Sequence, residues 1–298
     1  MKKRIVSRII IAFIVILTLF SLGCISTAFL REVTEPSLFK QLKGNEALKT
    51  MPAEASLVFA LNPTLEQTTN FVTIWETLAE VPEFKEALDE LQEDLLELEE
   101  KGFSFKEDIE PWLTLDFAIS LINLEEEEPD MLAALVTRDK AKSDAFLRKL
   151  RQKRMEEGEE LVKLIPYKGV TIFYHKSERE EERPVIFATF KDLLLLSNKL
   201  ELMQEAIDIG QGKGEALIED ENYQTTVAAL PPDSASHLYL ALGELIDLAL
   251  EDYPQSLVLT QREAMEATKG LAASLSFSPD GIKIHVVISY DAEKLPEE

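Results

Sequence analysis

Residues 270–290 have the sequence GLAASLSFSPDGIKIHVVISY, and this stretch decides the fold. Two runs rich in apolar and β-branched residues flank the turn Pro279-Asp280-Gly281. Strand-like runs joined by a tight turn that contains glycine are typical of an antiparallel hairpin. The sequence therefore predicts a closing hairpin with Gly270–Ser278 and Ile282–Tyr290 as its strands.

Two motifs in this region are repeated earlier in the chain. Pro232–Ser236 (PDSAS), which precedes LYLAL, matches Pro52–Ser56 (PAEAS), which precedes VFAL. Leu271–Leu275 (LAASL) matches Phe117–Leu121 (FAISL), and each leads into a hairpin pattern. We therefore expect an α+β fold of two related halves, residues 51–215 and 216–298, each with a strand, helices and an antiparallel hairpin. Two units are too few for a solenoid.

The first half also contains four short apolar runs joined by short links. Such links favour an antiparallel β-meander over parallel strands, which need long crossovers. The expected strands are Leu161–Ile165, Val170–His175, Pro184–Phe190 and Leu193–Ser197.

Periodic apolar residues and capping patterns predict the helices. Ser104 and Glu107 have capping-box spacing, and so do Asn198 and Glu201. The clearest apolar stripe lies in Pro82–Lys101, where it fits a face packed on the core or a partner helix. The expected helices are Thr64–Val81, Pro82–Lys101, Phe105–Leu113, Asp139–Glu157, 198–209, Asp220–Ala229, Gly243–Leu250 and Gln255–Ala267.

Two segments concentrate charge of one sign. Asp139–Glu157 carries seven lysines and arginines, which fits a surface helix paired with acidic elements, or a site for phosphate or anionic lipid. Glu125–Glu128 has four adjacent glutamates and is expected to be an exposed hairpin tip, with cation binding as the alternative.

The first thirty residues predict a membrane tether. Four cations, Lys2, Lys3, Arg4 and Arg8, precede 22 residues without a formal charge, Ile9–Leu30. This length suits a spanning helix. Ser21-Leu22-Gly23-Cys24 instead resembles a bacterial lipobox, which makes Cys24 the lipidation candidate, and Ser26-Thr27-Ala28 offers a third reading, signal cleavage. All three place the rest of the chain outside the cytoplasm, with residues 31–50 as a linker.

Composition limits the classes of partner. Beyond the anchor the chain carries 27 lysines and arginines against 55 acidic residues, a field that repels nucleic acid. Cys24 is the single cysteine, so no disulfide can form within the exported part.

Four stretches, in this order, resemble the bacterial family catalogued as "domain of unknown function 3352". They are MPAEASLVFALN, GFSFKEDIEPWLTLDFAISL, FATFKDLLLLSNKLELMQEAI and LPPDSASHLYLAL. The resemblance implies an N-terminally anchored extracytoplasmic domain and implies no reaction.

The residues give no signature of catalysis or of a cofactor. His175, His237 and His285 lack metal-ligand spacing, and no G-x-S-x-G elbow is present. We expect no enzyme, no catalytic or metal residues and no cofactor. The expected function is a tethered envelope protein that binds or scaffolds a protein partner. The alternatives are a carrier or sensor of a hydrophobic or lipid ligand between the halves, and an unrecognised hydrolase.

Overall fold

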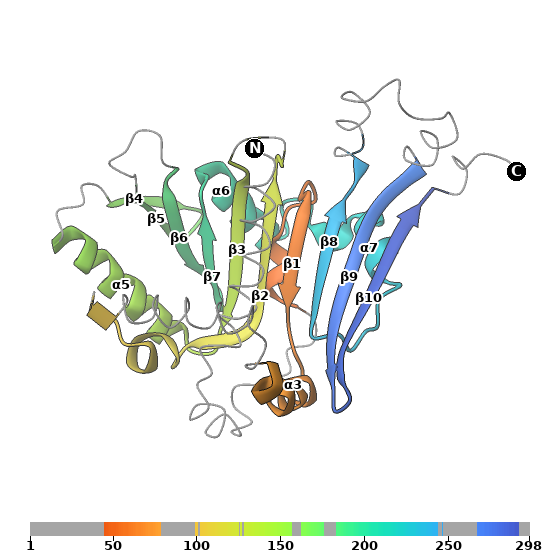
Figure 1. Cartoon of the computed structure of the whole chain (residues 1–298). Coiled ribbons are helices and arrows are strands. Elements are labelled where there is room, and N and C mark those ends of the chain that lie inside the picture. The colour runs from red at the N-terminus through yellow and green to blue at the C-terminus, as the bar shows by residue number, and fades with distance from the viewer. Residues whose placement is uncertain are drawn as a thin grey trace, which may run out of the picture.

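The computed structural model describes residues 45–78, 99–100, 102–124, 126, 128–156, 162–175, 183–243, 246 and 267–291. Within these ranges one ten-stranded sheet organises the fold, in the order β10-β9-β8-β1-β2-β3-β7-β6-β5-β4 (Figure 1). The strands are β1 Leu57–Leu61, β2 Leu113–Ile122, β3 Asp130–Thr137, β4 Val162–Tyr167, β5 Val170–His175, β6 Val185–Phe190, β7 Leu193–Ser197, β8 Ser236–Ala241, β9 Thr268–Ser278 and β10 Gly281–Tyr290.

Each neighbouring pair of these strands is antiparallel. The α+β class and the antiparallel pairing are therefore confirmed. Strands β4 to β7 pair in succession and form the expected meander, and β9 and β10 form the closing hairpin. Gly281 follows the hairpin turn with φ of 131°, a backbone conformation that favours glycine.

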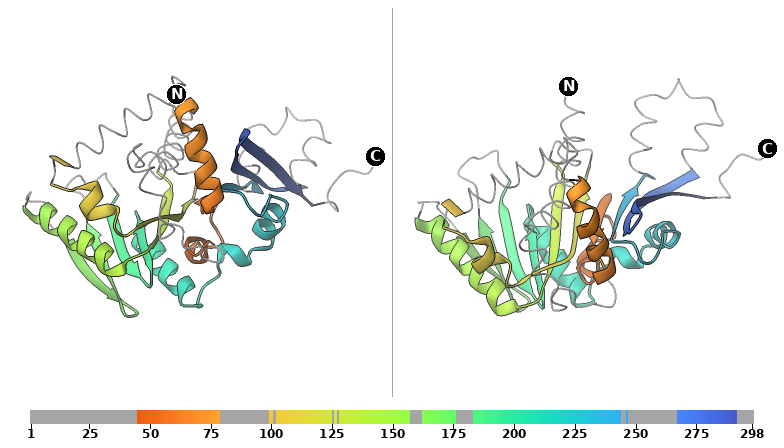
Figure 2. Two further views of the ribbon diagram at one scale, coloured as in Figure 1. Left: turned by 90° about the horizontal axis from the view of Figure 1, so that it is seen from below. Right: turned by 60° about the horizontal axis from the view of Figure 1, so that its bottom comes forward.

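Few helices accompany the sheet in the described ranges. They are η2 Ala47–Thr50, α3 Leu65–Leu78, η3 Phe105–Ile109, α5 Lys140–Glu156, α6 Leu200–Gly210, η4 Leu217–Glu219 and α7 Glu221–Val227. In Figure 2, α5 lies at the β4 end of the sheet and α7 lies at the β9–β10 end.

Alternating side chains give the sheet two faces, which we name after the helices that lie on them. On the α6 face, Ala118, Ala134, Leu195 and Ala188 are directly opposite one another on β2, β3, β7 and β6. Three alanines in this line leave room for α6, whose Met203 is fully buried in the same core. Helices α6 and α7 therefore close this face.

On the α5 face, the cover differs along the sheet. At the meander end, Phe187 and Leu194 pack with Trp112 and with Leu147 of α5. At the hairpin end, α3 packs on β9, where the rings of Phe71 and Phe277 lie 4.8 Å apart and nearly perpendicular.

The predicted cap at Asn198 is wrong. Helix α6 begins at Leu200 after Lys199, and no side chain caps it. The Asn198 side chain instead accepts from the N–H of Met131 at 2.7 Å and donates to the carbonyl of Pro129 at 2.9 Å. Tertiary pairing with the start of β3 has replaced the local bond.

Other helix predictions are corrected in extent. The segment expected as helix Phe105–Leu113 is a five-residue π-helix that ends at Ile109, and β2 already begins at Leu113. Its predicted Ser104 cap is present, because Ser104 accepts from the N–H of Glu107 at 3.3 Å. The predicted helices Pro82–Lys101, Gly243–Leu250 and Gln255–Ala267 lie almost wholly outside the described residues.

Candidate functional site

The most unusual surface is a row of apolar side chains on β10. Five alternate residues are exposed, and they reach 68% exposure at Ile284. They share one face of the strand because successive side chains alternate in direction. This β10 row consists of Ile282, Ile284, Val286, Ile288 and Tyr290.

The β10 row lies on the α5 face and continues across its neighbours. Ile284 pairs with Leu275 of β9, and Leu275 pairs with Ser236 of β8. Paired residues point to the same side of a sheet. The pairing therefore identifies the side chains that adjoin the row on β9 and β8, and all of them are uncharged: Leu271, Ala273, Leu275, Phe277, Ser236, Leu238 and Leu240.

Helix α7 packs on the opposite face of the same hairpin, near Gly270 and Ser289. The ring of Tyr223 packs edge-on against Tyr239, at 5.1 Å between centroids. Thr226 and Ser289 lie within hydrogen-bond distance through their hydroxyls, at 2.5 Å. A side chain at Gly270 would meet Tyr239 at 3.1 Å and Thr226 at 3.2 Å, so this close approach depends on glycine. The hairpin is therefore held by α7 on one side, whereas on the other side α3 covers Phe277 and the β10 row is exposed.

His237 is part of the packing between α7 and the sheet. Its Nε2 lies 2.9 Å from the Tyr223 hydroxyl. Burial lowers the pKa of His237 to about 4 and raises the pKa of the Tyr223 phenol above its usual value. Both groups are therefore uncharged at neutral pH and form a neutral hydrogen bond under α7.

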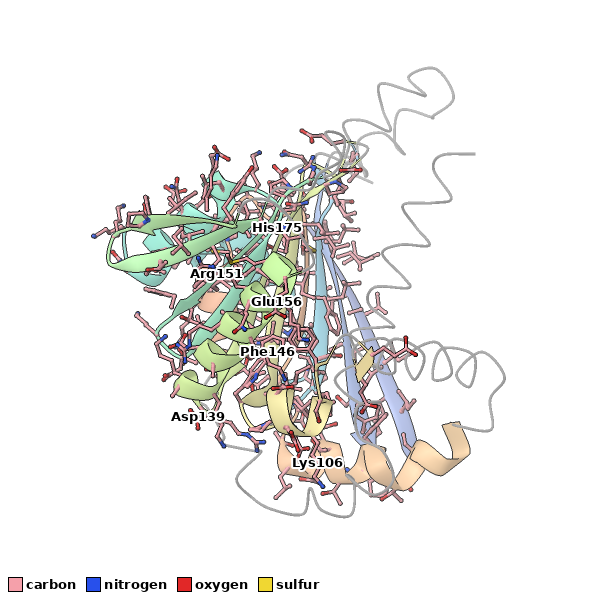
Figure 3. All side chains as sticks on the ribbon, turned by 90° about the vertical axis from the view of Figure 1, so that its left-hand side faces the viewer. Lys106, Asp139, Phe146, Arg151, Glu156 and His175 are labelled. Carbon is pink, nitrogen blue, oxygen red and sulfur yellow. The ribbon has the colours of Figure 1, made fainter. Side chains whose placement is uncertain are left out.

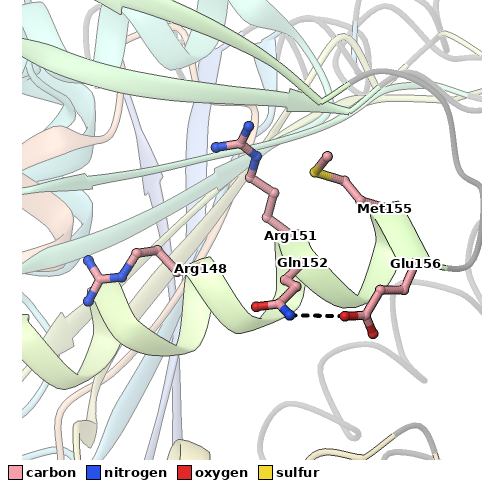
Figure 4. Close-up of a pocket in the computed structure, with 5 residues that line it drawn as sticks. All are labelled: Arg148, Arg151, Gln152, Met155 and Glu156. Atoms are coloured by element: carbon pink, nitrogen blue, oxygen red, sulfur yellow. Dashed lines mark hydrogen bonds between the residues drawn. The ribbon is translucent and has the colours of Figure 1, made fainter.

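The second feature is an open pocket along α5, with a volume of about 370 Å³ (Figure 4). Arg151 and Met155 point from the helix toward the overlying strands, and Gln152 donates to Glu156 at 2.9 Å. Arg148 completes the lining. Figure 3 shows α5 from Asp139 through Phe146 and Arg151 to Glu156.

Not every cation of α5 faces this pocket. Lys149 donates to Asp108 at 2.5 Å and lies over the ring of Phe103. Although partial burial opposes it, the bond from Lys149 lowers the pKa of Asp108. Arg151 is different, because its Nε is buried and makes no hydrogen bond to the described part of the chain. The pocket therefore presents arginine and methionine together.

The glutamate tip between β2 and β3 is part of an ionic cluster. Arg183 contacts Glu126 at 2.9 Å and Glu128 at 3.5 Å, and it also donates to Asp130. Lys199 donates to Asp130 at 2.5 Å. Burial alone would raise the pKa of Asp130, but the bonds from Lys199 and Arg183 lower it below its usual value. These carboxylates therefore connect the β2–β3 turn to the residues that flank β6 and β7 of the meander.

Two further carboxyl groups have raised pKa values. Burial raises the pKa of Asp116, on β2, to about 7. Burial and the negative charge of Glu54 raise the pKa of Glu205, on α6, to about 7. Neither group is among the residues that line the α5 pocket.

The residues that the sequence singled out are not brought together. His175 lies on β5, His237 on β8 and His285 on β10. Across residues 45–291, as far as the structure describes them, no group of three or more His, Cys, Asp or Glu side chains could hold a metal ion. Cys24 and the whole predicted anchor lie outside the described residues, and no helix described is long and apolar enough to span a membrane.

Sequence reasoning missed the β10 row as a surface. Its alternation is visible in GIKIHVVISY, since Lys283, His285 and Ser289 separate the apolar residues. Alternation predicts that one side of a strand is apolar, yet it does not show whether a helix covers that side. The exposure became evident only from the positions of α3, α5 and α7.

The family "Protein of unknown function (DUF3352)" matches residues 9–297 of the chain. The chain belongs to this family. No curated protein matches it. Among solved structures, the one described as "Structure of crystal form I of TP0453" is similar with a TM-score of 0.37 and 9% sequence identity. That match covers 84% of this chain and 81% of the other.

Proposed function

We propose that this DUF3352 protein is a membrane-tethered, extracytoplasmic protein of the cell envelope that binds or scaffolds a protein partner without catalysing a reaction. Its N-terminal thirty residues would hold it at the membrane, through a spanning helix or through lipid on Cys24.

The β10 row is the observation that carries this proposal. Monomeric soluble proteins rarely expose large contiguous apolar patches, and those that do often use them for protein contacts. Five neighbouring apolar side chains between 41% and 68% exposed form such a patch with the adjoining face of β9. A rigid strand also suits a docking surface, because α7 fixes the hairpin from behind.

Two of the perturbed titratable groups have structural explanations that need no catalytic role. His237 is neutral because it is buried under α7, and Asp130 is held by Lys199 and Arg183. Each of these shifts has a structural cause in the packing around it. Neither group is among the residues that line the α5 pocket.

We also propose that the chain consists of two related halves. The order β10-β9-β8-β1-β2-β3 supports this, because each central strand adjoins its own hairpin on the outer side. The echoed strands β1 and β8 are direct neighbours, with Val58 opposite Tyr239. The echo aligns Val58 with Leu238, which points to the other face, so the two copies differ by one residue in register.

The α5 pocket favours a second candidate function. Arginine attracts anionic groups, and the methionine side chain adapts to apolar chains. A small anionic amphiphile would contact both kinds of side chain. The protein would then act as a carrier or sensor of this ligand, with the site within the first half rather than between the halves. Binding of a lysophospholipid to the full chain, lost in Arg151→Gln and kept in Lys142→Gln, would support it.

The binding proposal is tested by site-specific photo-crosslinking in native membranes. A photoreactive amino acid replaces Ile284 in one strain and Leu164 in the other, since both are exposed apolar residues on outer strands. We expect a protein adduct from position 284 and little from position 164. Equal yields from the two positions would show that the β10 row is not a binding surface.

The tether is tested separately by Cys24→Ser. If Cys24 carries lipid, the variant loses its lipid label and stays unprocessed; if the segment spans the membrane, size and location are unchanged. In either case protease added to intact cells, with the outer permeability barrier opened, should digest the domain. Protection until the cells are lysed would refute the extracytoplasmic location.

A further inference from the structure

The α5 face is apolar at both ends of the sheet, but α5 and η3 cover it at the meander end, whereas at the hairpin end α3 covers Phe277 and leaves the β10 row exposed. Phe187 and Leu194 lie under α5 and η3, and both are buried. Ile284 and Val286 lie on the same face at the other end and are mostly exposed. The hairpin end therefore has an apolar surface that is suited to a second layer.

Charge indicates where two copies of this chain could approach. The chain has a formal net charge of −24, so most of its surface repels another copy. No acidic residue occurs in Gly281–Tyr290, and Lys283 and His285 alternate with the row and point to the opposite side. Together with Leu271–Phe277 of β9 and with β8, the strand offers a face without formal charge, and the Lys269–Asp291 ion pair lies at its end.

The β10 row also has the symmetry that a contact between identical surfaces requires. A two-fold interface places one patch against itself, so the patch must complement its own reverse. Val286 is the middle residue of the row, with Ile284 and Ile288 on either side of it. A two-fold axis near Val286 would set Ile284 of one copy against Ile288 of the other.

We infer that the β10 row docks against the β10 row of a second copy of this chain, so that the two sheets pack face to face at their hairpin ends. This inference rests on the proposed binding function and names its partner. The small size of the patch predicts a weak contact between freely diffusing chains. A common membrane tether raises the local concentration and makes such a contact sufficient.

Cysteine scanning in membranes tests the geometry. Single cysteines replace Ile282, Ile284, Val286, Ile288 or Tyr290 in the full-length chain, Leu164→Cys is the matched control, and the unchanged chain gives the background from Cys24. After mild oxidation, we expect disulfide-linked dimers to be most abundant near Val286→Cys and to decline toward both ends. Equal yields along the row, or no excess over Leu164→Cys, would overturn the inference.

Co-purification of two differently tagged full-length copies tests the occupant. We expect them to co-purify from mild detergent, and we expect Val286→Lys in both copies to reduce the yield about tenfold, because it buries like charges against each other. Leu164→Lys should leave the yield unchanged. Val286→Thr keeps the strand's shape and should weaken the contact less, which separates lost docking from lost folding.

The outcomes separate this inference from the proposed function. If the photoreactive residue at position 284 captures a different protein and the two tagged copies do not co-purify, the inferred self-association is wrong and the proposed binding function stands. If the photoreactive residue at 284 reacts only within its own chain, at residues 244–266, then that segment covers the row and both proposals fail.

Discussion

The two ends of the α5 face have similar amino acids and opposite surroundings. At the meander end, Phe187 and Leu194 are buried under α5 and η3. At the hairpin end, the β10 row is exposed although its residues are at least as apolar. The difference shows that the strands do not determine burial by themselves. Burial depends on which segment lies over them, and at the hairpin end the described segments leave the β10 row exposed.

The largest expected difference concerns truncation of one aliphatic side chain at each end. Leu194→Ala should lower the free energy of unfolding by about 2–5 kcal/mol, because it leaves a cavity under α5. Ile284→Ala, at 68% exposure, should cost about 1 kcal/mol or less in the monomer. Denaturant unfolding of the full-length protein in detergent, at low protein concentration, measures both. Equal costs would mean that the row is covered within the monomer.

The ionic cluster of the meander end gives the next effect. Asp130 is 5% exposed at its side chain and accepts from Lys199 and Arg183. Asp130→Asn should lower the free energy of unfolding by about 1.5–3 kcal/mol, the usual range for a hydrogen bond to a charged group. Asp280→Asn, in the exposed turn of the β9–β10 hairpin, is the matched control and should change it by less than about 0.5 kcal/mol.

The hairpin end should lose stability in acid through His237. Its folded pKa of about 4 lies below the ordinary 6.5, so between these values the unfolded chain binds more protons. The free energy of unfolding should therefore fall by about 1–3 kcal/mol from pH 7 to 4. His237→Gln should remove that slope. Tyr223→Phe should keep it, because burial rather than the Tyr223 hydroxyl causes the shift; a flat profile in Tyr223→Phe would contradict this.

The meander end should respond to pH with the opposite sign through Glu205 on α6. Its folded pKa of about 7 lies above the ordinary 4.5, so the folded state binds more protons in that window. Stability should fall as pH rises from 4.5 to 7, by about 0–1 kcal/mol because the group is partly exposed. Glu205→Gln should flatten the profile in urea titrations. If Glu205 and His237 contributed pH slopes of the same sign to the free energy of unfolding, the predicted difference between the two ends would be wrong.

Much of the sheet could be predicted from sequence because its signals are local. The predicted bounds of Val170–His175 and Leu193–Ser197 agree with β5 and β7, since short turns fix the register of a meander. The closing hairpin was equally clear from Pro279 to Gly281. Residues close together in the sequence are sufficient to predict these elements.

The remaining features depend on residues far apart in the chain. Asn198 has the local pattern of a helix cap, but its side chain instead accepts a hydrogen bond from the N–H of Met131 in β3. Glu126 and Glu128 are exposed as the sequence predicts, but their contacts with Arg183, more than fifty residues later, have no local signal. The candidate docking surface depends on the absence of cover at one place among the described residues, which no periodicity in the sequence can indicate.

The position of β1 has a consequence for biosynthesis. Leu57 pairs with Leu121 on one side and with Leu240 on the other, so β1 has one early partner and one late partner. At about 5–20 residues per second, β8 emerges roughly 10–35 s after β1. During that interval seven strands can assemble while the outer edge of β1 is unpaired. A nascent chain of this protein therefore passes through a stage in which one edge of β1 is unpaired, and addition of β8 ends it.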